Sequence, residues 1–143
     1  MGAPGIIAAG GVFRDNWGWV RGCFHFKGGK GFAFEAELLA VIHAIDIAHH
    51  CGWRQLWLEA DSTYIVRLLQ TRSVEVPWRF LAASKNLDDF QFHVSHIYRE
   101  GNKPTDLMAN LDRNEGWWPY ALDEIKLAVS LDMETHSTVR VKL

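Results

Sequence analysis

The stretch FEAELLAVIHAIDIAHHCGWRQLWLEADS, residues 34–62, decides the fold of this chain. Its first half predicts an amphipathic helix, because apolar residues recur at intervals of three and four on one side. The members of that apolar side are Leu38, Val41, Ile42, Ile45 and Ala48. Gly52 follows, and glycine suits the left-handed position that closes a helix. Residues 55–60 then alternate between two faces, which predicts a buried strand.

A carboxylate stands near each end of this helix–strand unit. Glu37 lies in the first turn of the predicted helix, and Asp61 lies where the predicted strand stops. Ser62 or Thr63 would then cap a second helix, predicted over residues 63–70. Because a helix can lie back across its own strand, the two carboxylates can meet at one side of the unit. The sequence therefore predicts a pocket there.

The elements on either side predict a mixed α/β sheet flanked by helices. Strands are expected at 6–13 and 19–26, followed by a loop at 27–31 and a short strand at 32–34. Farther along, helices are expected at 78–87 and 104–111, with a strand between them at 91–98. Residues 1–111 are predicted to form one domain. Residues 112–143 are predicted to form a C-terminal tail, with a short helix packed on the domain and Trp117–Trp118 tucked onto the core.

Composition limits the class of protein. The chain has 143 residues, of which 48% are hydrophobic and 22% charged, and this suits one globular domain. No apolar run approaches the roughly 20 residues of a membrane span, and the start lacks the pattern of a secretory signal. Cys23 and Cys51 fit no disulfide framework or zinc motif, so we expect buried, reduced thiols. These features predict an intracellular protein, nuclear or cytoplasmic, with no membrane partner.

The net charge of −2 bears on binding. Nucleic-acid binders usually carry a basic excess, because neutralising phosphates supplies much of their affinity. Any such binding here must depend on local patches and metal ions. Trp17 and Trp19, with Lys27 and Lys30, would suit stacking on bases and gripping a backbone. Hairpin packing and a solvated glycine-rich turn explain them equally well.

A third carboxylate, Asp106, lies early in the last predicted helix. Each acidic residue alone has a structural explanation, since acids in first turns complement the helix dipole. Together, however, carboxylates repel one another unless a cation holds them, and Mg²⁺ or Mn²⁺ prefers oxygen ligands. Two such ions can hold the attacking and leaving oxygens of a phosphodiester. His43 and Asp46 also have ligand-like spacing, but a solvated helix face explains them better because no further ligand lies nearby.

Four segments resemble successive motifs of one known family. They are GGVFRDNWG (10–18), AELLAVIHAI (36–45), LWLEADS (56–62) and HIYREGNKPTDLMANL (96–111). The chain resembles the plant-type ribonuclease H-like domain related to retroelement reverse transcriptases, from about residue 2 to residue 111. The resemblance implies the ribonuclease H fold, and hydrolysis of the RNA strand of RNA/DNA hybrids with two Mg²⁺ ions.

The resemblance also implies roles for individual residues. Glu37, Asp61 and Asp106 match the family's metal ligands, and His96 matches a histidine that assists proton transfer or product release. Asn102 falls in the family's Arg-Glu-x-Asn loop pattern. Arg79 and Lys85 fall where the family grips its substrate.

One family feature is missing from the sequence. The family begins with a strand bearing an Asp-Gly, just before the stretch that residues 3–5 resemble, and Met1 arrives too late to include it. Asp15 is no replacement, because it belongs to a hairpin turn. We therefore expect an N-terminally truncated domain, whose next strand has an unpaired edge unless a neighbour, the C-terminal tail or a second copy fills it. Two functions remain open: a nuclease, and a catalytically impaired remnant that binds nucleic acid or protein. Oligomeric state is not predicted.

Overall fold

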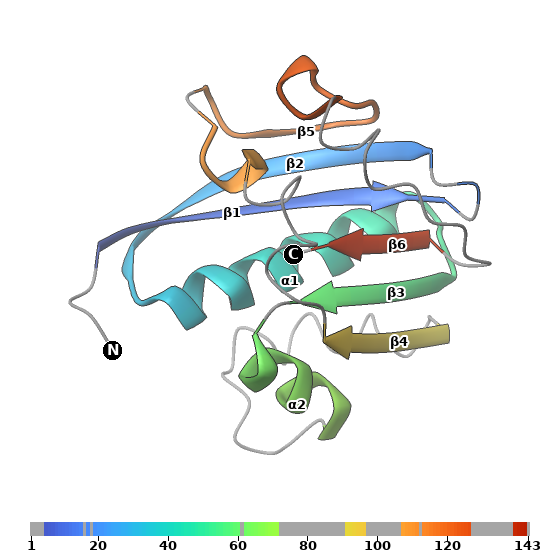
Figure 1. The fold of residues 1–143 in the computed structure, drawn as a ribbon, viewed down its shortest axis with the longest axis horizontal. Coiled ribbons are helices and arrows are strands. Elements are labelled where there is room, and N and C mark those ends of the chain that lie inside the picture. The colour runs from blue at the N-terminus through green and yellow to red at the C-terminus, as the bar shows by residue number, and fades with distance from the viewer. Residues whose placement is uncertain are drawn as a thin grey trace.

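The computed structural model describes residues 5–15, 17, 19–60, 62–71, 91–96, 107–111, 113–126 and 139–142, which form a mixed α/β fold around one six-stranded sheet (Figure 1). The strand order is β4-β3-β6-β1-β2-β5. The strands are β1 (Gly5–Arg14), β2 (Val20–Gly31), β3 (Gln55–Ala60), β4 (Gln91–His96), β5 (Gly116–Trp118) and β6 (Val139–Lys142). The helices are α1 (Ala33–His50), α2 (Thr63–Thr71) and the short 3₁₀ helix η2 (Asp123–Ile125). The predicted fold class is confirmed.

The α1–β3 unit follows the sequence pattern closely. The side-chain Oε1 of Glu35 accepts a hydrogen bond of 3.0 Å from the backbone N–H of Phe32, which fixes the start of α1. At the other end Gly52 has a φ of +74°, in the left-handed region that the helix end requires. In β3, Leu56 and Leu58 are fully buried, as their alternation predicts, and they share one core cluster with the apolar residues of α1. Helix α1 packs most closely on β1 and β2.

Strand β2 extends farther than the sequence suggests. The predicted loop at 27–31 and the predicted short strand at 32–34 are both wrong, because β2 continues to Gly31 and Phe32 is already the N-cap of α1. The reason is tertiary: this glycine-rich end pairs with the start of β1, with Gly31 opposite Gly5 and Lys30 opposite Ile6. Small residues on both strands allow the ladder to form despite their poor strand propensity.

Strand β6 lies at the centre of the sheet although it comes from the segment expected to be a tail. It runs antiparallel to β1, with Lys142 opposite Val12, and parallel to β3, with Lys142 beside Glu59. The C-terminal tail was one of the three segments expected to pair with the edge of β1, and its residues 139–142 do so. Strand β5, from the same tail, pairs with β2. The domain boundary at residue 111 stays a prediction, but the sheet takes strands from both sides of it.

Two clusters of buried residues cover the two faces of the sheet. The larger cluster packs α1 and α2 against one face, and Figure 1 shows α1 running behind the strands. The smaller cluster, on the other face, consists of Val12, Cys23, Met108, Leu122 and Ile125.

The predicted packing of Trp117 on the core is confirmed: its ring centroid lies 5.5 Å from that of Phe13 and 6.3 Å from that of Trp53. The tryptophan ring occupies the space where Gly22 would carry a Cβ atom. Cys23 is buried as expected, whereas Cys51 is exposed, because it follows the last turn of α1.

The remaining predicted elements are found in part. Helix α2 agrees with its prediction, and Ser62 is its capping side chain, since Oγ accepts a hydrogen bond of 3.3 Å from the N–H of Ile65. Residues 107–109 are helical within the predicted 104–111 helix, and η2 falls within the expected short helix of the tail. The predicted helix at 78–87 lies outside the described residues. Within the described ranges no helix is long and apolar enough to cross a membrane.

Candidate functional site

The ends of two parallel strands define the candidate site. Strands β3 and β4 run side by side in the same direction, and their last residues, Ala60 and His96, are register partners. Because the carboxyl ends of parallel strands meet at one edge of a sheet, the segments that follow both strands leave from the same place. Strand β6 ends at this edge too, with Lys142 beside Glu59. We call this the carboxyl edge; the three arrowheads lie together in Figure 1.

The first turns of both helices lie against each other beside this edge. The ring centroids of Phe34, in the first turn of α1, and Tyr64, in the first turn of α2, are 6.2 Å apart and nearly perpendicular. Asp61 itself lies outside the described residues, but it stands between Ala60 of β3 and Ser62, the cap of α2. Glu37 follows Phe34 by one helical turn and is half-buried. The first turn of α1 therefore lies close to the first turn of α2, and the predicted meeting of Glu37 with Asp61 stays a prediction.

The other predicted site residues divide into two groups. His96 is described and exposed at the end of β4, while Glu37 and His96 both interact with other residues of the chain. Outside the described residues lie Asp61, Asp106, Asn102, Arg79 and Lys85. Their predicted roles stay predictions. In the described part of the chain, no three His, Cys, Asp or Glu side chains are grouped closely enough to hold a metal ion.

The turn that follows Asp106 packs directly on the sheet. Met108 is fully buried, and a Cβ atom added to Gly10 of β1 would lie 2.7 Å from the carbonyl carbon of Met108 and would also contact the backbone of Ala109. Glycine at this position lets the helical backbone approach the strand. The location of the segment just after Asp106 is thus fixed by β1.

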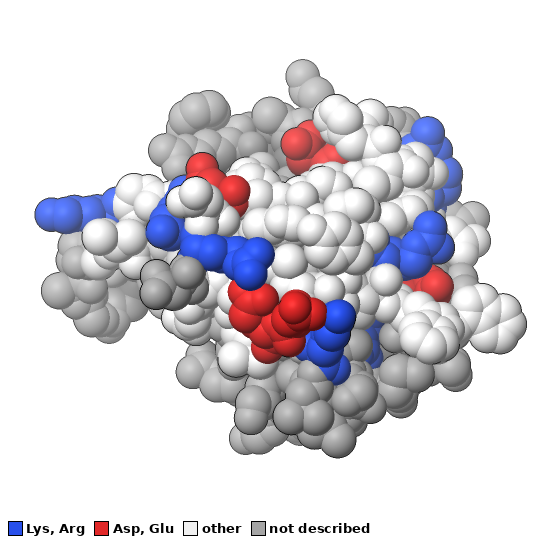
Figure 2. Space-filling model, turned by 90° about the horizontal axis from the view of Figure 1, so that it is seen from above, with Lys and Arg blue, Asp and Glu red and all other residues white. Residues whose placement is uncertain are grey.

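Charges of both signs are mixed on the described surface. Figure 2 shows basic and acidic side chains interspersed over one face, with wide areas of other residues between them. The backbone N–H of Lys27 donates a hydrogen bond of 2.8 Å to Oε2 of Glu115, which places an acid next to this basic residue. The described part of the face in Figure 2 therefore lacks the single-signed field that would attract a polyanion over a long range.

Buried charge gathers on the strands that flank β6. Arg14 of β1 and Glu59 of β3 are 4% and 3% exposed, and both interact with other residues. Arg14 is the register partner of Arg140, and Glu59 that of Lys142. Buried charges persist in folded proteins when they are paired, because isolated ones are expensive to desolvate. The alternation of β3 puts Glu59 on the face of the strand that points away from the main core, so the sequence does not predict that Glu59 is buried.

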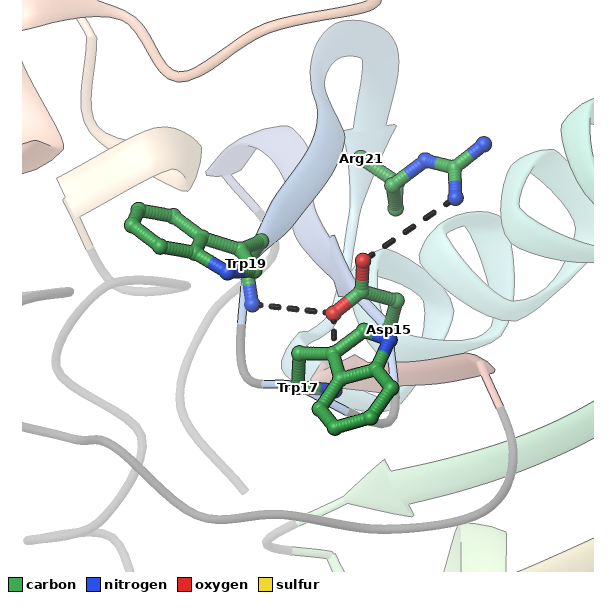
Figure 3. Close-up of polar contacts among 4 residues, drawn as sticks. All are labelled: Asp15, Trp17, Trp19 and Arg21. Atoms are coloured by element: carbon green, nitrogen blue, oxygen red, sulfur yellow. Dashed lines mark hydrogen bonds and ion pairs between the residues drawn. The ribbon is translucent and has the colours of Figure 1, made fainter.

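The turn between β1 and β2 holds two exposed tryptophans (Figure 3). Oδ1 of Asp15 accepts hydrogen bonds from the backbone N–H of Trp17 at 2.9 Å and of Trp19 at 3.0 Å. Its Oδ2 lies 3.9 Å from Nη1 of Arg21. The side chains of Trp17 and Trp19 are 66% and 68% exposed, so hairpin packing does not explain them. Lys27 and Lys30 lie at the far end of β2, which separates them from this turn. Sequence reasoning missed Arg21, although a basic residue six positions after a turn Asp is a usable signal.

The ring of His43 lies against an aromatic residue of β2. Its ring stacks on Phe26, with centroids 3.9 Å apart and an angle of 11° between the planes. Burial lowers the pKa of His43, while the charges of Asp46 and Glu115 act in the opposite direction. Asp46 instead lies 3.7 Å from the ring of His50. We expected His43 and Asp46 to lie on a solvated helix face. Asp46 does so, whereas the ring of His43 packs on the sheet.

Comparison with known proteins identifies the family. Residues 3–112 match the model of the family described as "Reverse transcriptase-like". Over 113 residues the chain is 35% identical to "Putative ribonuclease H protein At1g65750" of Arabidopsis thaliana, covering 76% of this chain. It spans only 18% of the length of that relative.

Solved structures agree with this result. Ribonuclease H1 from the halophilic archaeon Halobacterium salinarum superposes with a TM-score of 0.69 at 25% identity, covering 77% of this chain and 87% of that one. The N-terminal ribonuclease H domain of Rv2228c from Mycobacterium tuberculosis superposes with a TM-score of 0.54 at 22% identity, covering 73% and 88%, which is a likeness of fold. The chain therefore belongs to the reverse transcriptase-like family of ribonuclease H-like domains.

Proposed function

We propose that this domain binds RNA/DNA hybrids and hydrolyses their RNA strand by metal-assisted phosphodiester cleavage. The observation that carries the proposal is the carboxyl edge, where β3 and β4 end together beside the contacting first turns of α1 and α2. His96 ends β4 at this edge, Glu37 lies in α1 one turn after Phe34, and Asp61 directly follows β3 in the sequence. The family and the ribonuclease H name of its Arabidopsis relative support the same reaction. An RNA/DNA hybrid also implies an intracellular location, nuclear or cytoplasmic.

The proposed ligands suit a hard divalent cation. Glu37, Asp61 and Asp106 offer only carboxylate oxygens, which Mg²⁺ prefers and Mn²⁺ also accepts. The half-buried first turn of α1, next to the end of β3, suits such a group of ligands. Two bound ions would supply the positive charge that offsets the developing charge on the attacking and leaving oxygens.

The remaining residues would position the substrate and move protons. His96 is exposed at the end of β4, where its imidazole can accept or donate a proton near the scissile phosphate. Asn102, Arg79 and Lys85 would contact the hybrid, whose RNA strand is marked by 2′-hydroxyl groups in a wide minor groove. Arg79 and Lys85 supply the local positive charge that the overall charge of −2 does not.

A second function is favoured by one observation. The central position of the sheet is filled by β6, which brings Lys142, rather than an acidic residue, into register with Glu59 at the carboxyl edge. A domain with too few carboxylates at this edge would keep the fold but cleave slowly. It would then act as a nucleic-acid-binding or protein-interaction module.

Cleavage of a labelled RNA/DNA hybrid in Mg²⁺ tests the proposal, with binding measured separately by fluorescence anisotropy in EDTA. We expect Asp61→Asn to abolish cleavage while the circular dichroism spectrum is unchanged. The matched control is Asp46→Asn, which removes an exposed carboxylate at the far end of α1 and should cleave at the parental rate. His96→Ala should slow turnover and leave Mg²⁺ affinity, measured by calorimetry, nearly unchanged.

The outcomes separate the two functions. If the parental chain cleaves and Asp61→Asn cleaves equally fast, Asp61 is not part of the site. If the folded parental chain binds the hybrid but shows no Mg²⁺-dependent cleavage, the impaired binding module is the correct function. A folded chain that neither binds nor cleaves would refute both nucleic-acid readings.

A further inference from the structure

The turn between β1 and β2 presents two tryptophans to solvent, and the proposed hydrolysis gives neither of them a role. Trp17 and Trp19 are the two most exposed aromatic side chains among the described residues. One exposed aromatic residue on a protein surface needs no explanation. Two of them in one short turn form a concentrated aromatic surface. We call this surface, made of Asp15, Trp17, Trp19 and Arg21, the tryptophan turn.

Asp15 fixes the backbone of the tryptophan turn with three hydrogen bonds. Its Oδ1 atom accepts one from the N–H of Trp17 and one from the N–H of Trp19, as Figure 3 shows. Its own backbone N–H donates a third, of 3.0 Å, to the carbonyl oxygen of Trp19. A surface whose backbone is already ordered loses little conformational entropy when a ligand binds. The turn therefore holds both indole rings out on a fixed frame.

The tryptophan turn lies at the end of the sheet opposite the carboxyl edge. Strand β1 runs antiparallel to β6, and β6 runs parallel to β3, so β1 ends where β3 begins. Val12 and Glu59 are both register partners of Lys142, and Trp17 follows Val12 by five residues. At about 3.3 Å per residue, the turn is roughly 15–20 Å from the carboxyl edge. It is therefore a surface separate from the candidate hydrolytic site.

Basic side chains accompany the two aromatic rings. The side chain of Arg21 is 52% exposed, whereas that of its neighbour Asp15 is only 15% exposed. Arg54 is exposed just before β3, at the same end of the sheet. Asp46, an exposed acid in the last turns of α1, lies 3.7 Å from the ring of His50. The charge next to the two rings is therefore mainly that of the arginines, which suits an anionic ligand.

Unpaired nucleotides have the chemistry that fits this surface. Their bases stack on aromatic side chains whatever the sequence, and their phosphates pair with basic side chains. A duplex exposes the flat faces of its bases only at its two ends, so a single strand fits better. An apolar protein segment would fit less well, because aromatic anchors of protein interfaces are typically enclosed in well-packed pockets. Here the rings of Trp17 and Trp19 are about two-thirds exposed, at 66% and 68%.

We propose that the tryptophan turn binds single-stranded nucleic acid by stacking bases on Trp17 and Trp19, while Arg21 contacts a phosphate beside them. Binding tolerates any sequence, because every base has a flat face. It also depends only weakly on salt, since each phosphate contact with a single strand contributes about −0.7 to the slope of log K against log salt. The inference concerns a surface remote from the carboxyl edge and is independent of hybrid cleavage.

Fluorescence anisotropy with a labelled oligo(dT) of about 12 nucleotides tests the proposal in the full chain. The titrations contain EDTA and an unpaired strand, so their outcome does not depend on whether the domain cleaves hybrids. We expect saturable binding to the parental chain. Trp17→Ala and Trp19→Ala should each weaken it by at least about fivefold, the loss expected for one stacked base. Both residues are exposed, so the circular dichroism spectra should match that of the parent.

Matched controls separate stacking from other attractions. Trp19→Phe keeps a flat ring and should retain most of the affinity, whereas Trp19→Leu keeps only apolar bulk and should bind as weakly as Trp19→Ala. An abasic oligomer of the same length keeps the phosphates but has no bases, and it should bind at least about fivefold more weakly than oligo(dT). Arg21→Gln should make the salt slope shallower by about 0.7.

Three results would overturn the proposal. Equal affinity of the parent and both alanine variants would place the strand elsewhere on the protein. Full affinity of Trp19→Leu, or equal affinity for the abasic oligomer, would show that base stacking is not the attraction. A folded parental chain that does not bind oligo(dT) would exclude a single strand as the ligand of this turn.

Discussion

Replacing Gly10 with alanine should move the helical turn that follows Asp106 away from the sheet. The added Cβ atom would lie 2.7 Å from the carbonyl carbon of Met108 and 2.8 Å from its Cβ atom, and it would also contact the backbone of Ala109. Carbon atoms pack at about 3.5–4.0 Å, so the turn must shift by about 0.8–1.3 Å. Two of the three nearest atoms belong to the backbone, so a side-chain rotation cannot relieve the contact.

The shift has a cost in stability and, on the proposed hydrolysis, a cost in activity. Overpacking of this kind costs about 1–3 kcal/mol, from which the lower entropy of the unfolded alanine chain recovers about 0.4–1 kcal/mol. We expect the free energy of unfolding to fall by about 1–2 kcal/mol. A misplacement of about 1 Å near reacting groups can slow catalysis by up to about 100-fold. Cleavage should therefore fall by more than the small unfolded fraction explains.

Urea denaturation measures the first effect, with Gly5→Ala as the matched control in the same strand. Nothing lies within 4 Å of a Cβ atom built on Gly5, so this variant should be as stable as the parent or slightly more so. For a urea m-value of about 2 kcal/mol/M, Gly10→Ala should lower the midpoint by about 0.5–1 M. Equal midpoints for the two variants would refute the contact between β1 and the Met108 turn.

Two further predictions concern aromatic packing and pH. Trp117→Ala should lower the free energy of unfolding by about 3–5 kcal/mol in thermal or urea denaturation, because the ring packs on Phe13 and Trp53. The control is Trp17→Ala, which removes an exposed ring and should change that free energy by less than about 0.5 kcal/mol. Equal losses in the two variants would contradict the packing of Trp117. Burial lowers the pKa of His43 in the folded chain, so the unfolded chain binds more protons once the pH falls below the ordinary histidine pKa of 6.5, and the folded state should lose stability there. His43→Phe should therefore reduce the fall in the urea midpoint between pH 7 and pH 5. Parallel pH curves for the variant and the parent would show that His43 does not cause the fall.

The sequence predicts elements whose structure is determined by neighbours along the chain. Helix α1, Gly52 and β3 form a continuous unit, and its apolar periodicity and helix-ending glycine act locally. Ser62 can likewise be predicted as a helix cap, because a helical apolar pattern follows it directly in the sequence. The carboxyl edge could be predicted for the same reason, since Glu37 and the end of β3 belong to this unit.

The elements that sequence reasoning missed depend on distant partners. The glycine-rich end of β2 has poor strand propensity and becomes a strand only because β1 pairs with it as far as Gly5. The four residues of β6 carry no local sign that they lie at the centre of a sheet. Glu59 is buried although nothing near it in the sequence indicates this, and its register partner Lys142 lies more than eighty residues away in the chain.

The position of β6 also affects the order in which the domain can fold. Among the described strands, β1 to β5 precede β6 in the chain, and β6 is the strand that pairs with both β3 and β1. Before β6 pairs with them, the described residues of β1 and β3 that it contacts offer backbone groups to other extended segments. Contacts between such distant segments also slow folding, because a large loop must close first. We therefore expect the pairing of β6 with β1 and β3 to form late in the folding of the sheet.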